Sequence, residues 1–366
     1  MPQTPGSLPV ATEQSNGGSG RPQAEITISS LQGWHLPLLD DPAFLPLQPL
    51  LQRQLLLALP RRVASALGRR PAQALQVLVA SRHDARGRSH AVGLLLARAH
   101  NRSGSCMELQ QLVLASALER HADLSGRTVA ASLLREAIER SRNAASWIAS
   151  VSSLETARLA VLRELGFQPQ RTDRLHRWQA TTDASPATPL PANLQLRPLQ
   201  SRTAPLLWHL EQTTCQAPLR QLLDRRVEDL LDRSESRGWL LIDGERNEAV
   251  AAVRWVADHP AGGERVELSV HPGWSRLYGA PTEHLLRSLT TGDRPLWISA
   301  EVGDTARNGW LLEIGAEEQG EEVLMARTVW RRQEGAVALR PAQRLGAVLE
   351  RLQPGRRPVP TPLAPR

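Results

Sequence analysis

A loop of small residues leads into a helix: Ser125-Gly126-Arg127-Thr128-Val129-Ala130, continued by Leu133, Leu134, Ala137 and Ile138 at helical spacing. An apolar strand over 147–151 follows, and then a second helix that ends on Leu165-Gly166-Phe167. Where such a loop enters its helix, unpaired N–H groups meet the positive end of the helix dipole, so a phosphate can bind there. The right-handed crossover rule places the strand of 147–151 beside the strand that precedes the loop.

The composition predicts a folded chain of about two domains. It has 366 residues, of which 41% are hydrophobic and 22% charged. Lysine is absent, so all 44 basic residues are arginine and the net charge is +7. The arginines are interspersed with acidic residues and form no basic stripe with aromatic residues, so nucleic-acid binding is not expected. Cys106 and Cys215 are too few for a disulfide framework or a metal site, and we expect no metal.

No apolar run is long enough to cross a membrane. The richest one, 45–59, is interrupted by Pro46, Pro49 and Arg53. The first residues contain no apolar core of the signal-peptide kind. We therefore expect a cytoplasmic protein that does not associate with membranes.

The hydrophobic pattern occurs twice along the chain. We expect a disordered tail over 1–23, a first domain over 24–180, a Pro-rich linker over 181–191 and a second domain over 192–332. The remainder, 333–366, is expected to form a short helix and a Pro/Arg tail. Each domain shows one strand, two helices, three strands, a helix, a strand, a helix and a strand. The fold class is thus mixed α/β, with two tandem domains that each have a separate, mostly antiparallel sheet flanked by helices.

The element order and the loop resemble those of the GNAT superfamily of acyl-CoA-dependent N-acyltransferases. The phosphate loop of that family reads Q/R-x-x-G-x-G/A, and its last helix commonly closes on an ending similar to Leu165-Gly166-Phe167. In the first domain the pattern falls on Ser125, Thr128 and Ala130, of which Ala130 fits. In the second domain Arg276 and Gly279 fit, and Pro281 stands at the last position.

The resemblance implies acetyl-CoA or another acyl-CoA as co-substrate. The cofactor-binding residues would be Gly126, Arg127, Thr128, Val129 and Ala130 in the first domain, and Arg276, Gly279 and Ala280 in the second. It also implies that, in each domain, the strand before the loop and the strand after the next helix are parallel neighbours that separate at their ends. The pantetheine arm of the co-substrate enters that gap. We expect the first domain to be the site, because Pro281 removes one N–H donor from the second.

Catalysis in this family is direct attack of an amine on the acyl thioester. The resemblance makes Glu108 the candidate general base of the first domain and Glu267 that of the second. The tyrosine that often protonates the leaving thiolate would align with Leu162 and Leu311, so neither domain has it. A thiolate can leave without that help, so the loss weakens activity without excluding it.

Two functional hypotheses stay open. In the first, the chain transfers an acyl group to an amine of a small molecule or a protein, using one active domain and one degenerate domain. In the second, both domains are retained as a catalytically inactive scaffold or ligand-binding protein. Each loop also has an ordinary interpretation as a strand-to-helix turn that binds nothing. Neither the acceptor nor the oligomeric state can be predicted from the sequence.

Overall fold

The computed structural model describes residues 26–66, 75–83, 88–116, 118, 124–180, 190–290 and 293–329. The expected tail over 1–23, most of the linker and all of 333–366 lie outside the described residues. Every strand and helix below belongs to one unit, Met1–Val329. Among the described residues, no helix combines the length and the apolar character needed to span a membrane.

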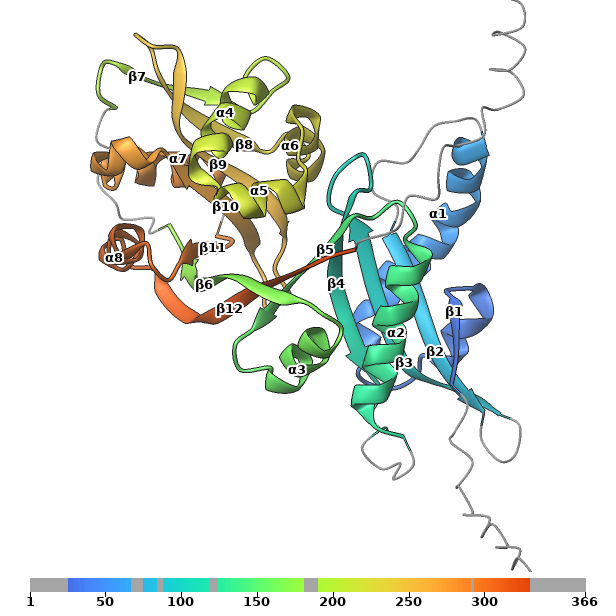
Figure 1. Ribbon diagram of the computed structural model, residues 1–366. Helices are drawn as coiled ribbons and strands as arrows, with labels where there is room; N and C mark the ends of the chain where they lie inside the picture. Colours follow the sequence, from blue (N-terminus) through green and yellow to red (C-terminus); the bar gives the residue numbers. More distant parts are fainter. Residues whose placement is uncertain are drawn as a thin grey trace, which may run out of the picture. The chain divides into compact units, whose positions relative to one another are not determined.

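The element order repeats as predicted (Figure 1). The first half contains β1 (Ile26–Ser30), the 3₁₀ turns η1 (Gly33–Leu38) and η2 (Leu45–Leu47), α1 (Gln48–Ala66), β2 (Leu75–His83), β3 (Ser89–Ala99), β4 (Cys106–Leu114), α2 (Gly126–Arg140), β5 (Ser146–Ser152), α3 (Thr156–Glu164) and β6 (Gln168–Trp178). The second half contains β7 (Leu194–Pro198), α4 (Ala204–Thr214), α5 (Ala217–Leu223), α6 (Val227–Ser234), β8 (Gly238–Asp243), β9 (Glu248–Asp258), β10 (Glu264–Val270), η4 (Pro272–Leu277), α7 (Ala280–Leu289), β11 (Leu296–Glu301), α8 (Thr305–Glu313) and β12 (Glu317–Thr328).

Two helix boundaries differ from the prediction. The two helices expected over 47–67 are one helix, α1, which continues through Pro60. The helix expected over 219–231 is broken instead into α5 and α6. The break falls at Asp224, whose φ of 43° is left-handed and ends α5. This short break directs the following arginine, Arg225, into the interior described below.

All twelve strands form one sheet, in the order β1-β2-β3-β4-β5-β12-β6-β11-β10-β9-β8-β7. The expectation of two separate sheets is therefore wrong. Each half sends its last strand into the other: β12 pairs with β5 of the first half, and β6 pairs with β11 of the second. The two exchanged strands are antiparallel neighbours at the centre of the sheet. The exchange joins two similar units into one hydrogen-bonded ladder.

Both exchanged strands are longer than the segments that the sequence pattern predicts as strands, 174–178 and 323–328. Charged side chains alternate along them, and Arg174 lies 3.6 Å from Glu321 across the β6–β12 pair. Arg177 and Glu317 form a similar cross-strand pair at 3.5 Å. Opposite charges on facing positions stabilise an antiparallel pair without an apolar pattern, which is why the sequence showed only part of each strand.

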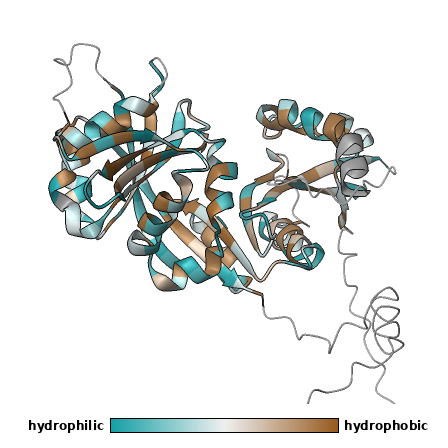
Figure 2. Ribbon diagram, turned by 90° about the horizontal axis from the view of Figure 1, so that it is seen from above, coloured by the Kyte–Doolittle hydropathy of each residue, from teal (hydrophilic) through white to brown (hydrophobic). Residues whose placement is uncertain are grey.

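The helices cover both faces of the sheet with their apolar sides (Figure 2). In the first half α2 and α3 pack on one face around Trp147 and Phe167, while η1, η2 and α1 cover the other around Phe44. In the second half α7 and α8 cover one face, and α4 and α6 the other. Helix α5 crosses between the halves, because Leu219 and Leu223 pack against strands of the first half.

Candidate active site

The parallel strand pair separates in both halves, as predicted. In the first half β4 and β5 pair from Cys106↔Ser146 to Leu109↔Ala149, and both strands then continue without pairing to each other. In the second half β10 and β11 pair only as far as Val266↔Ile298. Each gap leaves backbone N–H and C=O groups of two strands facing a space into which an extended ligand can add hydrogen bonds.

A β-bulge lies beside each gap, on β4 in the first half and on β9, at Val256, in the second. On β3 and β4, Ala97 pairs with Leu109 and Leu96 with Gln111, so Gln110 has no partner residue across that pair. A bulged residue is left unpaired and bends its strand, which here helps β4 diverge from β5. The matching part of β10, from Glu267 to Val270, pairs with β9 without interruption. No local pattern in the sequence indicates the bulge on β4, because Gln110 and Gln111 are adjacent and either could be the unpaired residue.

A cavity of about 590 Å³ lies on the α2–α3 side of the first gap. Its lining comes from the end of β4, the first turn of α2 and the loop and first turns of α3: Leu112, Leu114, Gly126, Arg127, Ala130, Leu154, Glu155, Thr156, Ala157, Arg158, Ala160 and Val161. Three of the residues predicted to bind cofactor, Gly126, Arg127 and Ala130, are among them. Leu154 at the rim is 85% exposed, an apolar surface that a ligand can cover.

The loop of the first half is a capped helix start. Ser125 is the N-cap, and its Oγ accepts from the N–H of Arg127 at 3.2 Å. The N–H of Val129 donates to the carbonyl of Ser125. These two bonds occupy the N–H groups of Arg127 and Val129, which we expected to face a phosphate. The N–H groups of Gly126 and Thr128 lie in the first turn, where the helix has no carbonyl that can accept from them. The Arg127 side chain pairs with Glu164 at 2.8 Å, and both are exposed.

The loop of the second half has different contacts. The Arg276 guanidinium stacks over Trp274, 4.7 Å from the ring centre. Gly279 caps α7 with a φ of 147°, and Pro281 follows in the first turn. The Thr282 hydroxyl donates to the carbonyl of Leu277 at 2.6 Å. The three residues predicted here, Arg276, Gly279 and Ala280, do not line either of the two cavities described here.

A second cavity, of about 470 Å³, lies where the two halves meet and reaches both gaps. Residues of β4 and β5, among them Gln110 and Ser150, line one part of it, and residues of β10 and β11, such as Ser269 and Ser299, line another. Glu108 and Glu267 both line it, so the structure brings the two predicted bases to one cavity. They occupy equivalent positions, each opposite an arginine of the preceding strand, Arg98 and Arg254 respectively.

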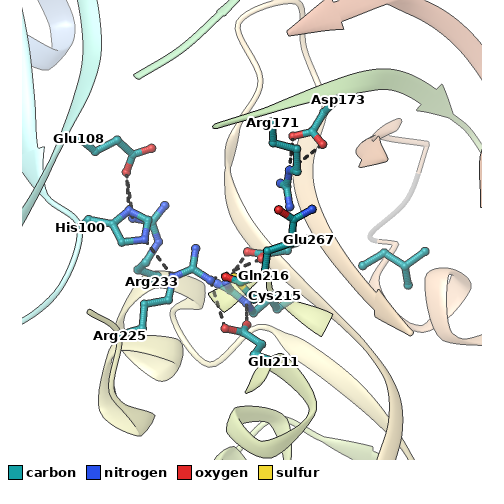
Figure 3. A network of polar contacts seen from close by, with 12 residues as sticks. His100, Glu108, Arg171, Asp173, Glu211, Cys215, Gln216, Arg225, Arg233 and Glu267 are labelled. Atoms are coloured by element: carbon teal, nitrogen blue, oxygen red, sulfur yellow. Dashed lines mark hydrogen bonds and ion pairs between the residues drawn. The ribbon is translucent and has the colours of Figure 1, made fainter. Parts of the chain in front are cut away.

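A chain of polar contacts joins these two carboxylates (Figure 3). Arg233 of α6 donates to Glu108 at 2.9 Å. Arg225, which follows the break after α5, donates to Nε2 of His100 at 2.9 Å and lies within 3.4 Å of Glu267. The sequence prediction missed both arginines, because nothing in a helix pattern shows that its arginines point inward.

No protein-family model and no curated protein matches this chain. Similar solved structures include a GCN5-related N-acetyltransferase from Sphaerobacter thermophilus, with 13% identity, 69% of this chain and 80% of that chain covered, and a TM-score of 0.45. A tandem GNAT protein from the clavulanic acid biosynthesis pathway has 14% identity, 72% and 85% coverage and a TM-score of 0.46. A GNAT-family acetyltransferase from Colwellia psychrerythraea has 11% identity, 83% and 100% coverage and a TM-score of 0.40.

The repeated element order and the separating parallel strands in each half are the features that the sequence predicted from its resemblance to a known family.

The electrostatics of the two halves keep both candidate bases ionised. Burial alone would raise the pKa of Glu108, but the charge of Arg233 and the contacts with His100 and Arg98 hold it well below its usual range. Burial acts in the same way on Glu267, and the charges of Arg254 and Arg225 outweigh it, so its pKa is also lowered. Both side chains are therefore carboxylates at neutral pH that accept a proton weakly.

Two further titratable groups lie in the same cavity. Burial, with the charges of Arg233 and Arg225, lowers the pKa of His100 to about 3, so this imidazole is neutral at pH 7. Asp173 of β6 has a pKa raised by burial, although Arg171 lies 2.8 Å away.

The two leucines that stand at the position of the family's tyrosine are buried. Leu162 is 1% exposed and Leu311 is fully buried, and each packs in the core of its half. Neither position presents a proton donor to the gap.

Proposed function

We propose that this protein is an N-acyltransferase that moves an acyl group from acyl-CoA to an amine, with its donor site in the first half. The observation that carries the proposal is the 590 Å³ cavity between the end of β4, which has there separated from β5, and the first turns of α2 and α3. Its shape offers a helix start for the pyrophosphate and a strand gap for the pantetheine arm. The orphan N–H groups at Gly126 and Thr128 suit phosphate oxygens.

The bulge at Gln110 supports the chemistry at the thioester. An unpaired backbone N–H beside the gap can donate to the carbonyl oxygen as negative charge develops on it in the tetrahedral intermediate. An amine that arrives as an ammonium ion first loses one proton to water; its nitrogen then forms a bond to the carbonyl carbon, the C–S bond breaks, and the leaving thiolate takes a proton from water to become coenzyme A. The amine proton passes to Glu108 or to a water that Glu108 orients, since Glu108 is two residues from the bulge.

The acceptor would enter through the second cavity. Eight carboxylates and six arginines line it, in a chain whose net charge is +7. This local excess of negative charge favours a cationic amine over an anionic substrate. Small molecules and exposed amines of proteins both meet that description.

The test is a matched pair of exposed alanines. Ala157 of α3 lines the first cavity, and Ala306 holds the same position in α8. We expect Ala157→Trp to abolish binding of acetyl-CoA in a calorimetric titration and to abolish release of coenzyme A thiol with a panel of amines. Ala306→Trp should leave both unchanged. Binding that survives in the Ala157→Trp protein would place the donor elsewhere.

The alternative, a scaffold that binds acyl-CoA without turning it over, is favoured by the buried leucines at the tyrosine positions. Wild-type protein that binds acetyl-CoA in the first cavity and yet releases no thiol with any amine would support it.

A further inference from the structure

The helix after the second parallel strand begins with the same residues in both halves. Glu155 precedes Thr156-Ala157-Arg158 in α3, and Asp304 precedes Thr305-Ala306-Arg307 in α8. Each acidic residue holds the arginine three positions later, at 3.1 Å in the first half and 3.2 Å in the second. Arg158 and Arg307 are thus equivalent side chains at the mouths of two equivalent gaps.

In the first half the arginine stands beside an open cavity. Arg158 lines the 590 Å³ space, and its Nη1 bonds to Glu155. Its Nε is buried, and no hydrogen-bond partner for this atom lies among the described residues. A buried donor without a partner costs about 1–3 kcal/mol, which a ligand carbonyl or phosphate oxygen in the cavity would relieve.

In the second half the equivalent arginine crosses the gap. Nη1 of Arg307 donates to the carbonyl oxygen of Leu268 at 3.2 Å, and Nε donates to the hydroxyl of Tyr278 at 3.1 Å. Leu268 lies two residues beyond Val266, the last residue of β10 that pairs with β11. Its carbonyl therefore belongs to the separated part of the strand. The Tyr278 ring lies 5.5 Å from that of Trp310 of α8.

We propose that the second half holds a closed acyl-donor site, in which the Arg307 side chain takes the place of the pantetheine arm of an acyl-CoA. The carbonyl of Leu268, which an amide of that arm would bind, accepts from the Arg307 guanidinium instead. The Tyr278 hydroxyl, in the loop before α7, accepts from the same guanidinium. The chain accordingly has one donor site, and the gap of the second half is part of the acceptor cavity, which Arg307 also lines. This proposal takes its class of ligand, an acyl-CoA, from the proposed function.

The experiment counts coenzyme A molecules bound per full-length chain by isothermal titration calorimetry. Wild-type protein should bind one, and Arg307→Ala should bind two, because the gap of the second half is then empty. Arg158→Ala is the matched control, since it removes the equivalent arginine: it should still bind one, with affinity lowered about tenfold, the loss of one charge-assisted hydrogen bond. Arg307→Ser serves as a second opening variant, because its short side chain cannot replace the bonds of Arg307 to Leu268 and Tyr278.

Ala157→Trp separates this inference from the proposed function. The single variant should bind no coenzyme A, and Ala157→Trp combined with Arg307→Ala should bind one. Binding of one molecule by Ala157→Trp alone would refute the donor site of the first half. One molecule bound by folded Arg307→Ala and Arg307→Ser proteins, with the wild type also at one, would show that Arg307 does not close the second site. Two molecules bound by the wild type would overturn the closure as well.

Discussion

Nε2 of His176 lies 2.8 Å from Oδ1 of Asn308, and both residues are buried. His176 belongs to β6 and so to the first half, whereas Asn308 belongs to α8 of the second. The amide nitrogen of Asn308 donates to the carbonyls of Glu301 and Asp304, each at 2.8 Å, so its oxygen faces the imidazole and accepts from Nε2–H. The exchanged strand is thus fixed to its host by a specific side-chain bond as well as by the sheet.

The exchange predicts that the halves cannot be separated by cutting the chain between them. We expect a protein with a protease site inserted within 181–189 to remain a single species on size-exclusion chromatography after complete cleavage. The reason is that β6 of the first half hydrogen-bonds to β11 and β12 of the second, and β12 hydrogen-bonds to β5 and β6 of the first. Two separate peaks from the cleaved protein would contradict the exchange.

The sequence predicted the elements of this fold better than their pairing. The repeated order and the separating parallel strands follow from local patterns and from the handedness of crossovers. Local patterns do not show which strand β6 pairs with, because β5 and β11 are equivalent strands. Residues such as Arg174 and Arg177 would suit either neighbour. Single chains carry no local signal for an exchange between similar halves.

The candidate site, too, was predicted only in part from the sequence. Small residues and helical spacing indicated the loop at Gly126, which lines the first cavity. The contacts that involve Arg225, Arg233 and Arg307 bring together residues far apart in sequence, and each of these arginines looks like a solvated one in its own helix. The repeated acidic-Thr-Ala-Arg segment at Arg158 and Arg307 was a visible signal, although its meaning depends on which partners each arginine reaches.

Arg233→Met should destabilise the protein most at neutral pH. The variant leaves Glu108 buried without its closest cation, and breaking a buried pair costs about 3–5 kcal/mol. Glu108 is 21% exposed and keeps Arg98 at 3.5 Å, so we expect a loss at or below the lower end of that range. Urea denaturation at pH 7 measures it.

The pH dependence of that loss has a definite sign. Glu108 has a lowered pKa, so its contribution is present above the unfolded value of about 4.3 and is lost as the pH falls through the folded value. His100, with its pKa lowered to about 3, costs stability as the pH falls below about 6.5, and Arg233 is one cause of that lowering. Both effects weaken in Arg233→Met. The difference in unfolding free energy between wild type and variant should therefore shrink from pH 7 to pH 4, and a difference that grows would contradict the assignment.

Glu108→Gln and Glu267→Gln separate the roles of two carboxylates in equivalent positions. If the first half carries the donor, Glu108→Gln should lower kcat by about 10²-fold, the lower end of the usual contribution of a positioned proton acceptor, because its lowered pKa makes Glu108 a weak base. Glu267→Gln should change kcat much less, because Glu267 lies in the half whose gap is occupied by Arg307. KM for acetyl-CoA should stay near the wild-type value in both. Equal losses of kcat in the two variants would show that the loss comes from the network of charged side chains that both carboxylates share, and not from a base in the first half.

Thr128→Pro tests the phosphate-binding role of the α2 N-terminus. Thr128 is exposed and stands in the first turn of α2, where an N–H has no partner within the helix, so proline deletes a ligand donor while the helix can persist. A hydrogen bond to a charged group contributes about 1.5–3 kcal/mol, so the Kd for acetyl-CoA should rise at least tenfold. Val129→Pro differs in kind, because the N–H of Val129 donates to the carbonyl of Ser125 and its buried side chain packs in the core. That variant should lose thermal stability together with binding. Calorimetric affinity and circular dichroism on both proteins decide the matter: a folded Thr128→Pro protein with wild-type affinity would exclude this helix start as the phosphate site.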